Sequence, residues 1–259
     1  MIKEIFCDSA VDYEFQPDGG KTPVVDAYDG CQMACPYCFQ WQDQTWNENI
    51  LVKTNIAEIL DRELQDWEST RTLYVGSRSD PYMAMESKYH LTRRILQVIN
   101  KHELPCVLST KSSAPALLED IGQFLAFKKR LTICIGQSNL NELQRHVNTF
   151  DLPNIIVANK LISSGLTVWI FITPVLPGIT DVHAMIANLP QKTPIFLDKL
   201  RLEPGSDSER RFFKLIKDHY PELEKRYRKM ISAGTDSYYQ ELKETYRDQT
   251  QVKFIFGEN

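Results

Sequence analysis

The residues best suited to chemistry are three cysteines in one short segment. Cys31, Cys35 and Cys38 follow a Cys-x3-Cys-x2-Cys spacing, and thiolates this close usually bind one inorganic centre. A zinc site would need a fourth ligand, and zinc cysteines commonly occur as two Cys-x2-Cys pairs. The sequence has no second such pair and no histidine near these cysteines. Three thiolates with one ligand missing suit a [4Fe–4S] cluster whose fourth iron stays open for a small molecule.

The alternative is that these are three unrelated cysteines in a loop. A strand-like run at residues 23–27 and a Gly turn precede the motif, and this context disfavours the alternative. Of the other three cysteines, Cys7 and Cys106 are interpreted as small buried apolar residues. The five histidines show no ligand spacing.

Composition indicates a globular protein with a real core. Apolar residues make up 42% of the 259 residues and charged residues 25%, which is ordinary for such proteins. The net charge of −4 argues against a general nucleic-acid binder, which is more often basic. Six cysteines with three of them clustered do not resemble a disulfide framework.

Reduced thiols predict a cytoplasmic location. Acidic residues occur within the first eight residues, too early for a signal peptide. No apolar run approaches the roughly 20 residues that span a bilayer.

Strands and helices alternate along most of the chain. Apolar patterning predicts strands at 23–27, 73–76, 106–109, 131–135, 167–172 and 195–202. Helical spacing falls at 55–67, 88–102, 114–127, 141–164 and 182–188. This alternation predicts an α/β fold with a parallel sheet and right-handed crossovers. Chemistry gathers at the carboxyl ends of such strands, where the cysteine loop lies.

We expect a single domain in three parts. Residues 1–22 form a turn-rich lead-in, residues 23–205 the core, and residues 206–259 charged helices with a closing strand at 252–256. A partial barrel is a natural closure for six strand–helix units. The Lys- and Arg-rich run at 210–229 is interleaved with acidic residues, so we interpret it as a solvated helical face rather than a nucleic-acid groove.

The cysteine spacing resembles the signature of the radical SAM enzymes. The resemblance implies a (β/α)6 partial TIM barrel with a short helical C-terminal extension, one [4Fe–4S] cluster, and S-adenosylmethionine chelated to the open iron. It also implies reductive cleavage of S-adenosylmethionine to a 5′-deoxyadenosyl radical that abstracts hydrogen from a substrate. Tyr37, the aromatic residue before the last cysteine, and Phe39 would lie at the cofactor, with Tyr37 near its adenine.

The strand ends are similar to those of the spore photoproduct lyase branch. Ser79 matches a serine at the S-adenosylmethionine site, and Asp80 and Glu86 match acidic positions. Lys111 matches a lysine that would pair with the cofactor carboxylate as a point charge. Read without the resemblance, the segment 77–82 is a plain turn and Lys111 a solvated surface charge.

Two further strand ends extend the resemblance. Cys134 stands where the family has a serine beside the cofactor; it is either a buried inert thiol or a hydrogen donor near the radical. Thr173, in the Pro-rich turn after the fifth strand, would lie next to the adenine. Six residues are expected to contact substrate or to flank the pocket: Trp41, Tyr82, Glu86, Gln137, Arg201 and Glu203. For Trp41 and Tyr82 the alternative is a place in the core.

One departure bears on substrate. True spore photoproduct lyases carry a cysteine that returns hydrogen to the product radical, and Ser77 stands at that position. A hydroxyl O–H bond is too strong to donate a hydrogen atom to a carbon radical. This chain also has only 30 residues before the motif, where those lyases carry a longer region.

Three functional hypotheses follow. The first is a radical SAM enzyme acting on a peptide or ribosomally made precursor, by bond cleavage, epimerisation or crosslinking. The second is a lyase or repair enzyme acting on nucleic acid, and the third a non-catalytic iron–sulfur sensor. The expected partners are an electron donor such as flavodoxin or ferredoxin and a small protein that presents the substrate, with no membrane.

Overall fold

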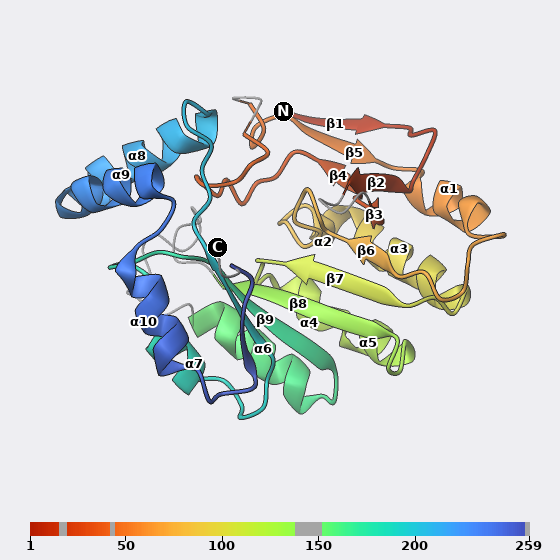
Figure 1. Cartoon of the computed structure of the whole chain (residues 1–259). Helices are drawn as coiled ribbons and strands as arrows, with labels where there is room; N and C mark the ends of the chain where they lie inside the picture. Colours follow the sequence, from red (N-terminus) through yellow and green to blue (C-terminus); the bar gives the residue numbers. More distant parts are fainter. Residues whose placement is uncertain (16–19, 42–44, 138–151, 257–259) are drawn as a thin grey trace.

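A computed structural model describes residues 1–15, 20–41, 45–137 and 152–256. Its main element is an eight-stranded sheet in the order β11-β10-β9-β8-β7-β6-β3-β2 (Figure 1). The strands are β2 Asp12–Phe15, β3 Lys21–Val25, β6 Leu73–Val75, β7 Cys106–Thr110, β8 Leu131–Gln137, β9 Thr167–Val175, β10 Ile195–Lys199 and β11 Val252–Phe254. Strands β3 to β11 are parallel to their neighbours in this sheet, and β2 pairs with β3 antiparallel.

Helices connect the parallel strands. They are α1 Ile56–Glu63, α2 Glu86–Tyr89, α3 Leu91–Lys101, α4 Pro115–Glu119, α5 Ile121–Ala126, α6 Leu152–Ser163, α7 Val182–Ala187, α8 Asp207–His219, α9 Glu224–Ala233 and α10 Ser237–Thr245, with a 3-10 turn at Pro221–Leu223. Helix α6 packs on β8 and β9, whereas α8 and α9 lie beyond the end of the sheet (Figure 1). No helix among the described residues combines the length and apolar character needed to cross a membrane.

The central strands have two different faces because successive side chains alternate. Leu108, Ile133 and Val168 lie side by side in the register and are buried in the core. The next row, on the opposite face, holds Ser109 and Trp169 on either side of Cys134. Ser109 is exposed and Trp169 half-buried, so this second face is the more open one.

A small second sheet closes the cysteine loop. It has the order β1-β5-β4, with bounds β1 Ile2–Ile5, β4 Tyr28–Asp29 and β5 Ile50–Lys53. Strand β4 ends just before the loop and β5 begins just after it, and the two pair antiparallel. The Cys31 amide also donates a 3.0 Å hydrogen bond to the Trp46 carbonyl. The segment that carries the three cysteines is therefore held at both ends.

The predicted alternation of strands and helices is confirmed as a mostly parallel α/β sheet. The curvature of a partial barrel and the three-part domain division stay predictions. The C-terminal helices and the strand near residue 252 are present. Part of the expected helical region, residues 141–151, lies outside the described residues.

Several bounds differ from the prediction. The lead-in contains strands β1 and β2, and the single helix expected at 114–127 is two helices that meet at Asp120. The strand expected at 195–202 stops at Lys199. The Leu200 amide donates instead to the Tyr239 hydroxyl at 3.2 Å, which takes it out of the sheet ladder.

Candidate active site

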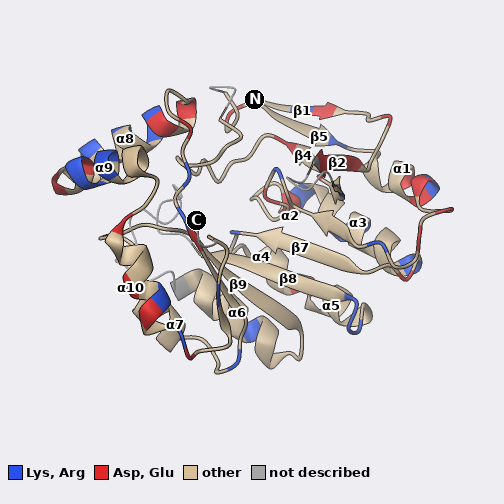
Figure 2. Cartoon of the chain, viewed as in Figure 1, with Lys and Arg blue, Asp and Glu red and all other residues tan. Residues whose placement is uncertain are grey.

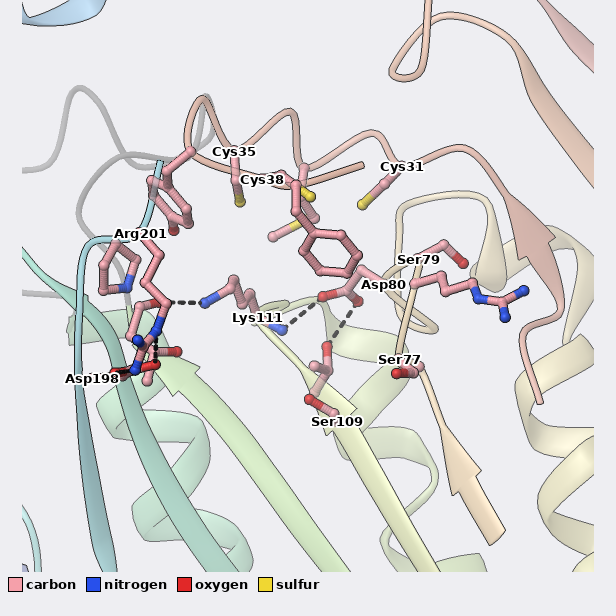
Figure 3. Close-up of a pocket in the computed structure, with 18 of the residues that line it drawn as sticks. Cys31, Cys35, Cys38, Ser77, Ser79, Asp80, Ser109, Lys111, Asp198 and Arg201 are labelled. Carbon is pink, nitrogen blue, oxygen red and sulfur yellow. Dashed lines mark hydrogen bonds and ion pairs between the residues drawn. The ribbon is translucent and has the colours of Figure 1, made fainter. Parts of the chain in front are cut away.

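The cysteine loop and the carboxyl ends of the parallel strands enclose one cavity of about 390 Å³. All three motif cysteines line it, together with residues after β6 and at the carboxyl ends of β7, β9 and β10. Figure 3 shows the loop on one side, with Asp80 and Lys111 facing it from the strand ends. Parallel strands bring their carboxyl ends to one edge of the sheet, which explains why residues far apart in sequence meet here.

The cysteines are free thiols in a poorly solvated setting. Cys35 is buried and Cys31 and Cys38 are partly exposed. Burial is the main cause that raises the pKa of all three thiols, to about 11 for Cys38. A buried thiol with a raised pKa stays protonated until a cation compensates the thiolate.

The donor set fits a cluster better than a single ion. No group of three His, Cys, Asp or Glu side chains within the described ranges is gathered closely enough for one metal ion. A single ion draws its thiolates to about 2.3 Å, whereas a [4Fe–4S] cluster binds each thiolate through a different iron and keeps the sulfurs farther apart. Cys31, Cys35 and Cys38 all line one cavity, and their thiolates are of the ligand type that such a cluster takes.

The loop has internal supports. Gly30, next to Cys31, has φ +100°, and an added Cβ would lie 2.6 Å from the Asn49 carbonyl oxygen; only glycine fits this turn without strain. The Trp41 indole N–H donates to the Cys35 carbonyl at 2.7 Å, and Trp41 is 3% exposed. Trp41 was expected to contact substrate, but it braces the back of the loop.

Asp80 is the centre of a buried hydrogen-bond network. Its carboxylate accepts from the Thr110 hydroxyl at 2.8 Å, the Lys111 amide at 2.6 Å and the Tyr82 amide at 2.9 Å. Burial raises the pKa of this carboxyl, and the three donors act in the opposite direction. The neighbouring Ser79 donates its hydroxyl to the Tyr28 carbonyl at 2.8 Å. Asp80 therefore ties the end of β6 to the end of β7.

Lys111 reaches across β8 to the end of β9. Its ammonium donates to the Thr173 carbonyl at 2.8 Å and lies 5.8 Å from the centre of the Tyr37 ring. The lysine can take this path because β8 has Gly136 at the crossing, where a Cβ would lie 2.7 Å from the Lys111 Cγ. Lys111, Thr173 and Tyr37 all line the cavity, so a positive charge is fixed close to the cysteine loop.

The far wall of the cavity comes from the end of β10. Arg201 lines it as expected, and its guanidinium pairs with Asp198 at 2.7 Å and 3.3 Å. Asp198 also lines the cavity and was not predicted. The sequence did hold a signal for Asp198. It lies two residues after Phe196 in an apolar strand, so its side chain lies on the same face as Phe196, near the carboxyl end of the strand.

The open face of the sheet carries aromatic side chains that the sequence reading did not assign to the site. Phe171 and Phe196 stack with ring centres 4.7 Å apart, and Trp169 lies 5.3 Å from Phe196. Phe171 and Trp169 are two and four residues before Thr173 in β9 and therefore share its face. These half-buried rings continue the open face of the sheet beyond Thr173 and are not among the cavity-lining residues.

No family model matches the chain. An uncharacterized protein of Methanocaldococcus jannaschii is 27% identical over 216 residues, covering 78% of each chain. An uncharacterized protein of Mycobacterium tuberculosis is 23% identical over 253 residues, covering 89% of this chain and 74% of the relative.

Among solved structures, a mutant of spore photoproduct lyase superimposes with a TM-score of 0.60, covering 85% of this chain at 12% identity. The chain has the fold of spore photoproduct lyase. The lyase complexed with dinucleoside spore photoproduct gives a TM-score of 0.59 at 11% identity. A further mutant with bound AdoMet and the dinucleoside gives 0.58 at 12% identity. This chain spans 66% of the lyase chain, just under two thirds.

The cavity brings together ten of the residues that the sequence predicted for the site. The cavity-lining residues among those expected are Cys31, Cys35, Cys38, Tyr37, Phe39, Ser79, Asp80, Lys111, Thr173 and Arg201. Phe39 is 67% exposed at its mouth. Ser77 also lines the cavity, and its hydroxyl donates to Glu14 at 2.8 Å. The motif and strand-end residues are thus brought together.

Two expected substrate residues are buried in the core instead. Tyr82 is fully buried and donates its hydroxyl to Asp120 at 2.8 Å. Glu86 is 1% exposed and accepts hydrogen bonds from the Tyr28 hydroxyl and the Arg93 amide. Burial raises the pKa of the Glu86 carboxyl. Both residues support the segment behind the cavity and do not line it.

The remaining expected residues also lie off the cavity wall. Gln137 shares its sheet face with Ile172, the buried helix-covered side, so the alternation of β8 points it away. Glu203 is exposed in the turn after β10 and is not among the cavity-lining residues. Cys134 is on the cavity face between Ser109 and Trp169 but is 5% exposed and does not line the cavity. Burial raises the pKa of the Cys134 thiol to about 12.

Proposed function

We propose that this chain is a radical SAM enzyme with one [4Fe–4S] cluster. One observation carries the proposal: the three motif cysteines line the same cavity as Asp80, Lys111 and other strand-end residues. The fold of spore photoproduct lyase, which has been solved with bound AdoMet, supports it.

The residues of the cavity have distinct roles in this proposal. Cluster and S-adenosylmethionine together supply the electron and the 5′-deoxyadenosyl radical that abstracts a substrate hydrogen. Cys31, Cys35 and Cys38 hold the cluster. The Lys111 ammonium is a fixed point charge for the cofactor carboxylate, and Asp80 holds the Lys111 backbone in position. Tyr37 and Thr173 bound the space for the adenine.

The test is an anaerobic cofactor assay. The reconstituted protein is mixed with S-adenosylmethionine and dithionite, and 5′-deoxyadenosine is quantified. We expect slow formation of 5′-deoxyadenosine without any added substrate. An intact cluster that yields no 5′-deoxyadenosine under any condition would instead support the iron–sulfur sensor.

A matched pair of variants makes the assay specific. Cys35→Ser removes a cluster ligand in the proposal, whereas Cys106→Ser changes a buried cysteine outside the cavity. Iron content and 5′-deoxyadenosine should be lost in the first variant and retained in the second. Equal iron binding by both variants would rule out the motif as the cluster site.

For the substrate we propose a peptide or ribosomally made precursor. The acidic net charge of −4 is unfavourable for a polyanion. Ser77 cannot return hydrogen to a product radical, and its hydroxyl already donates to Glu14. A small protein that presents the peptide, and a protein electron donor, complete this proposal.

A nucleic acid is the second candidate substrate, because the lyase that shares this fold has been solved with dinucleoside spore photoproduct. Adding UV-irradiated DNA to the same assay separates the two classes. A clear increase in 5′-deoxyadenosine with irradiated DNA favours repair chemistry. DNA-independent cleavage favours a peptide and directs the search to neighbouring genes.

A further inference from the structure

The cysteine loop separates two hollows. Its residues Cys31, Cys35 and Cys38 line the cavity described above, whereas Ala34 and Pro36 line a second hollow of about 220 Å³ that shares no lining residue with the first. Trp41 and residues of α8 complete this second hollow. The loop is therefore approached from two sides, and only one of them is needed for the cofactor and substrate of the proposed function.

The second hollow is linked to the cysteine loop through the Trp41 side chain. The Trp41 ring lies under the Arg211 guanidinium, with 3.6 Å from the guanidinium carbon to the ring centroid. The same indole donates to the Cys35 carbonyl at 2.7 Å. A continuous contact thus runs from α8 through Trp41 to the backbone of a motif cysteine.

The outer wall of this hollow is a basic lobe, defined as residues 207–233 of α8, the 3-10 turn and α9. It contains eight Lys and Arg and five Asp and Glu, whereas the rest of the chain contains 22 and 29. Figure 2 shows Lys and Arg on both α8 and α9. The chain is acidic as a whole, so this local excess of positive charge distinguishes the lobe from the remaining surface.

A groove follows α8 along the lobe. A third hollow, of about 430 Å³, shares Lys214 and Asp218 with the second. The Lys214 side chain is 79% exposed and pairs with Asp218 at 2.9 Å, and Lys217 is 56% exposed. Exposed pairs of this kind contribute little to stability, so these lysines are available to an incoming anionic surface.

From these observations we propose that the groove along α8 is the docking surface for a small acidic electron-transfer protein. The proposal rests on the proposed function. The partner loses one electron and the group held by the cysteines gains it, so no bond forms or breaks. The contact through Trp41 links this surface to the Cys35 backbone, and Trp41 is not among the residues that line the cofactor cavity.

The charge pattern favours an acidic protein over a nucleic acid. Five acidic residues are spread through the lobe, and they would repel a continuous phosphate backbone. A protein surface with separate carboxylates can instead match the separate lysines. Repulsion by the acidic remainder of the chain would steer such a partner toward this lobe, with strong dependence on salt.

Binding of a bacterial flavodoxin to the reconstituted protein tests the proposal. Affinity is measured by calorimetry at low and high salt for the wild type, Lys214→Glu and Lys217→Glu. A matched control, Lys160→Glu, reverses a charge on the exposed side of α6. We expect about tenfold weaker binding for each lobe variant at low salt, a smaller difference at high salt, and a change below twofold for the control.

A kinetic ratio provides the second readout. For each variant, the rate of 5′-deoxyadenosine formation with reduced flavodoxin is divided by the rate with dithionite. This ratio should fall at least fivefold in the lobe variants. Wild-type binding that Lys214→Glu and Lys217→Glu leave unchanged would overturn the proposal, as would tighter binding of a single-stranded oligonucleotide through the same lysines.

The outcomes remain distinguishable from failure of the proposed function. If dithionite produces no 5′-deoxyadenosine in the wild type, the proposed function fails whatever the flavodoxin affinity. If dithionite succeeds and the lobe variants behave as the wild type with flavodoxin, only the docking surface is wrong. Lys214→Gln, which removes charge without reversing it, should give an intermediate effect.

Discussion

At the scale of single residues, the site depends on how Asp80 and Lys111 fix each other. Asp80 is buried and accepts the Lys111 amide, and the Lys111 side chain extends to the Thr173 carbonyl. Asp80 anchors the backbone of Lys111, and the Lys111 side chain supplies the positive charge. This arrangement places an ammonium near the cysteine loop at little cost in side-chain entropy when a ligand binds.

Replacing Lys111 tests the role of that charge. Lys111→Ala should weaken S-adenosylmethionine binding about tenfold or more, because a hydrogen bond to a charged group contributes about 1.5–3 kcal/mol. Iron and sulfide content should not change. Affinity is measured by equilibrium dialysis, with Lys101→Ala as the control because the Lys101 side chain is 63% exposed and pairs with Asp61 on the surface. Equal affinities in the two variants would refute the assignment.

At the scale of elements, β8 contributes to the site through Gly136, which has no side chain. Gly136 leaves open the space that the Lys111 side chain occupies on its way from β7 to β9. A strand with a side chain at this point would push the lysine off its path. The parallel register brings the three strand ends together, and one glycine then decides where the charge lies.

Gly136→Ala should therefore reduce S-adenosylmethionine affinity without any change of charge. The added Cβ would lie 2.7 Å from the flexible Lys111 Cγ, so we expect the lysine to move and the fold to remain. Gly122→Ala is the control, since Gly122 is in α5 with nothing within 4 Å of an added Cβ. That change should stabilise the protein by about 0.5–1 kcal/mol and leave affinity unchanged. Equal affinity in Gly136→Ala would contradict the steric argument.

At the scale of the whole molecule, one buried carboxylate ties global stability to pH. Asp26 follows β3 and is 7% exposed, with one oxygen accepting from the Arg78 amide at 3.3 Å and the other without a hydrogen-bond partner. Burial raises the pKa of Asp26 to about 6. The folded protein therefore holds this proton more tightly than the unfolded chain does, and the contribution of Asp26 to stability declines as pH rises from about 4 to about 6.

Asp26→Asn should remove this penalty. The difference in free energy of unfolding between Asp26→Asn and the wild type should grow by about 1–2 kcal/mol from pH 5 to pH 8. It is measured by denaturant titration at both pH values. Asp61→Asn is a control without pH dependence in this range, because hydrogen bonds from Lys101 and His102 lower the pKa of Asp61, so its carboxylate is ionised in the folded and the unfolded chain at both pH values. A difference between Asp26→Asn and the wild type that is the same at both pH values would contradict the predicted ionisation.

The sequence predicted the parts of the fold that have a strong local pattern. The alternating apolar runs of β6 to β9 and the helical spacing of α3 were clear. Strand β5 was missed because Ile50–Lys53 is four residues long and is followed directly by a helical pattern. Its pairing with β1 and β4 depends on contacts between distant segments, which periodicity does not encode.

Sequence reasoning placed residues at the cavity when they follow a strand end. It misplaced residues whose position depends on the direction of the side chain. Lys111 and Thr173 follow β7 or end β9 on the open face and line the cavity. Gln137 was expected there too, but it is one residue past Gly136 and points to the opposite face. Glu86 was expected near substrate on the resemblance, and Tyr82 from its place beside the predicted pocket. Their burial depends on packing against α3 and α5 that the sequence does not show.

The pairing of β4 with β5 has a thermodynamic consequence for metal uptake. The two strands join the ends of the segment that carries the cysteines, so the conformational entropy of closing this loop is lost when the protein folds. A long flexible loop would otherwise lose that entropy when the metal binds. For the cluster of the proposed function, affinity for iron and sulfide would thus be coupled to the small sheet β1-β5-β4, and unfolding of that sheet alone would weaken this affinity.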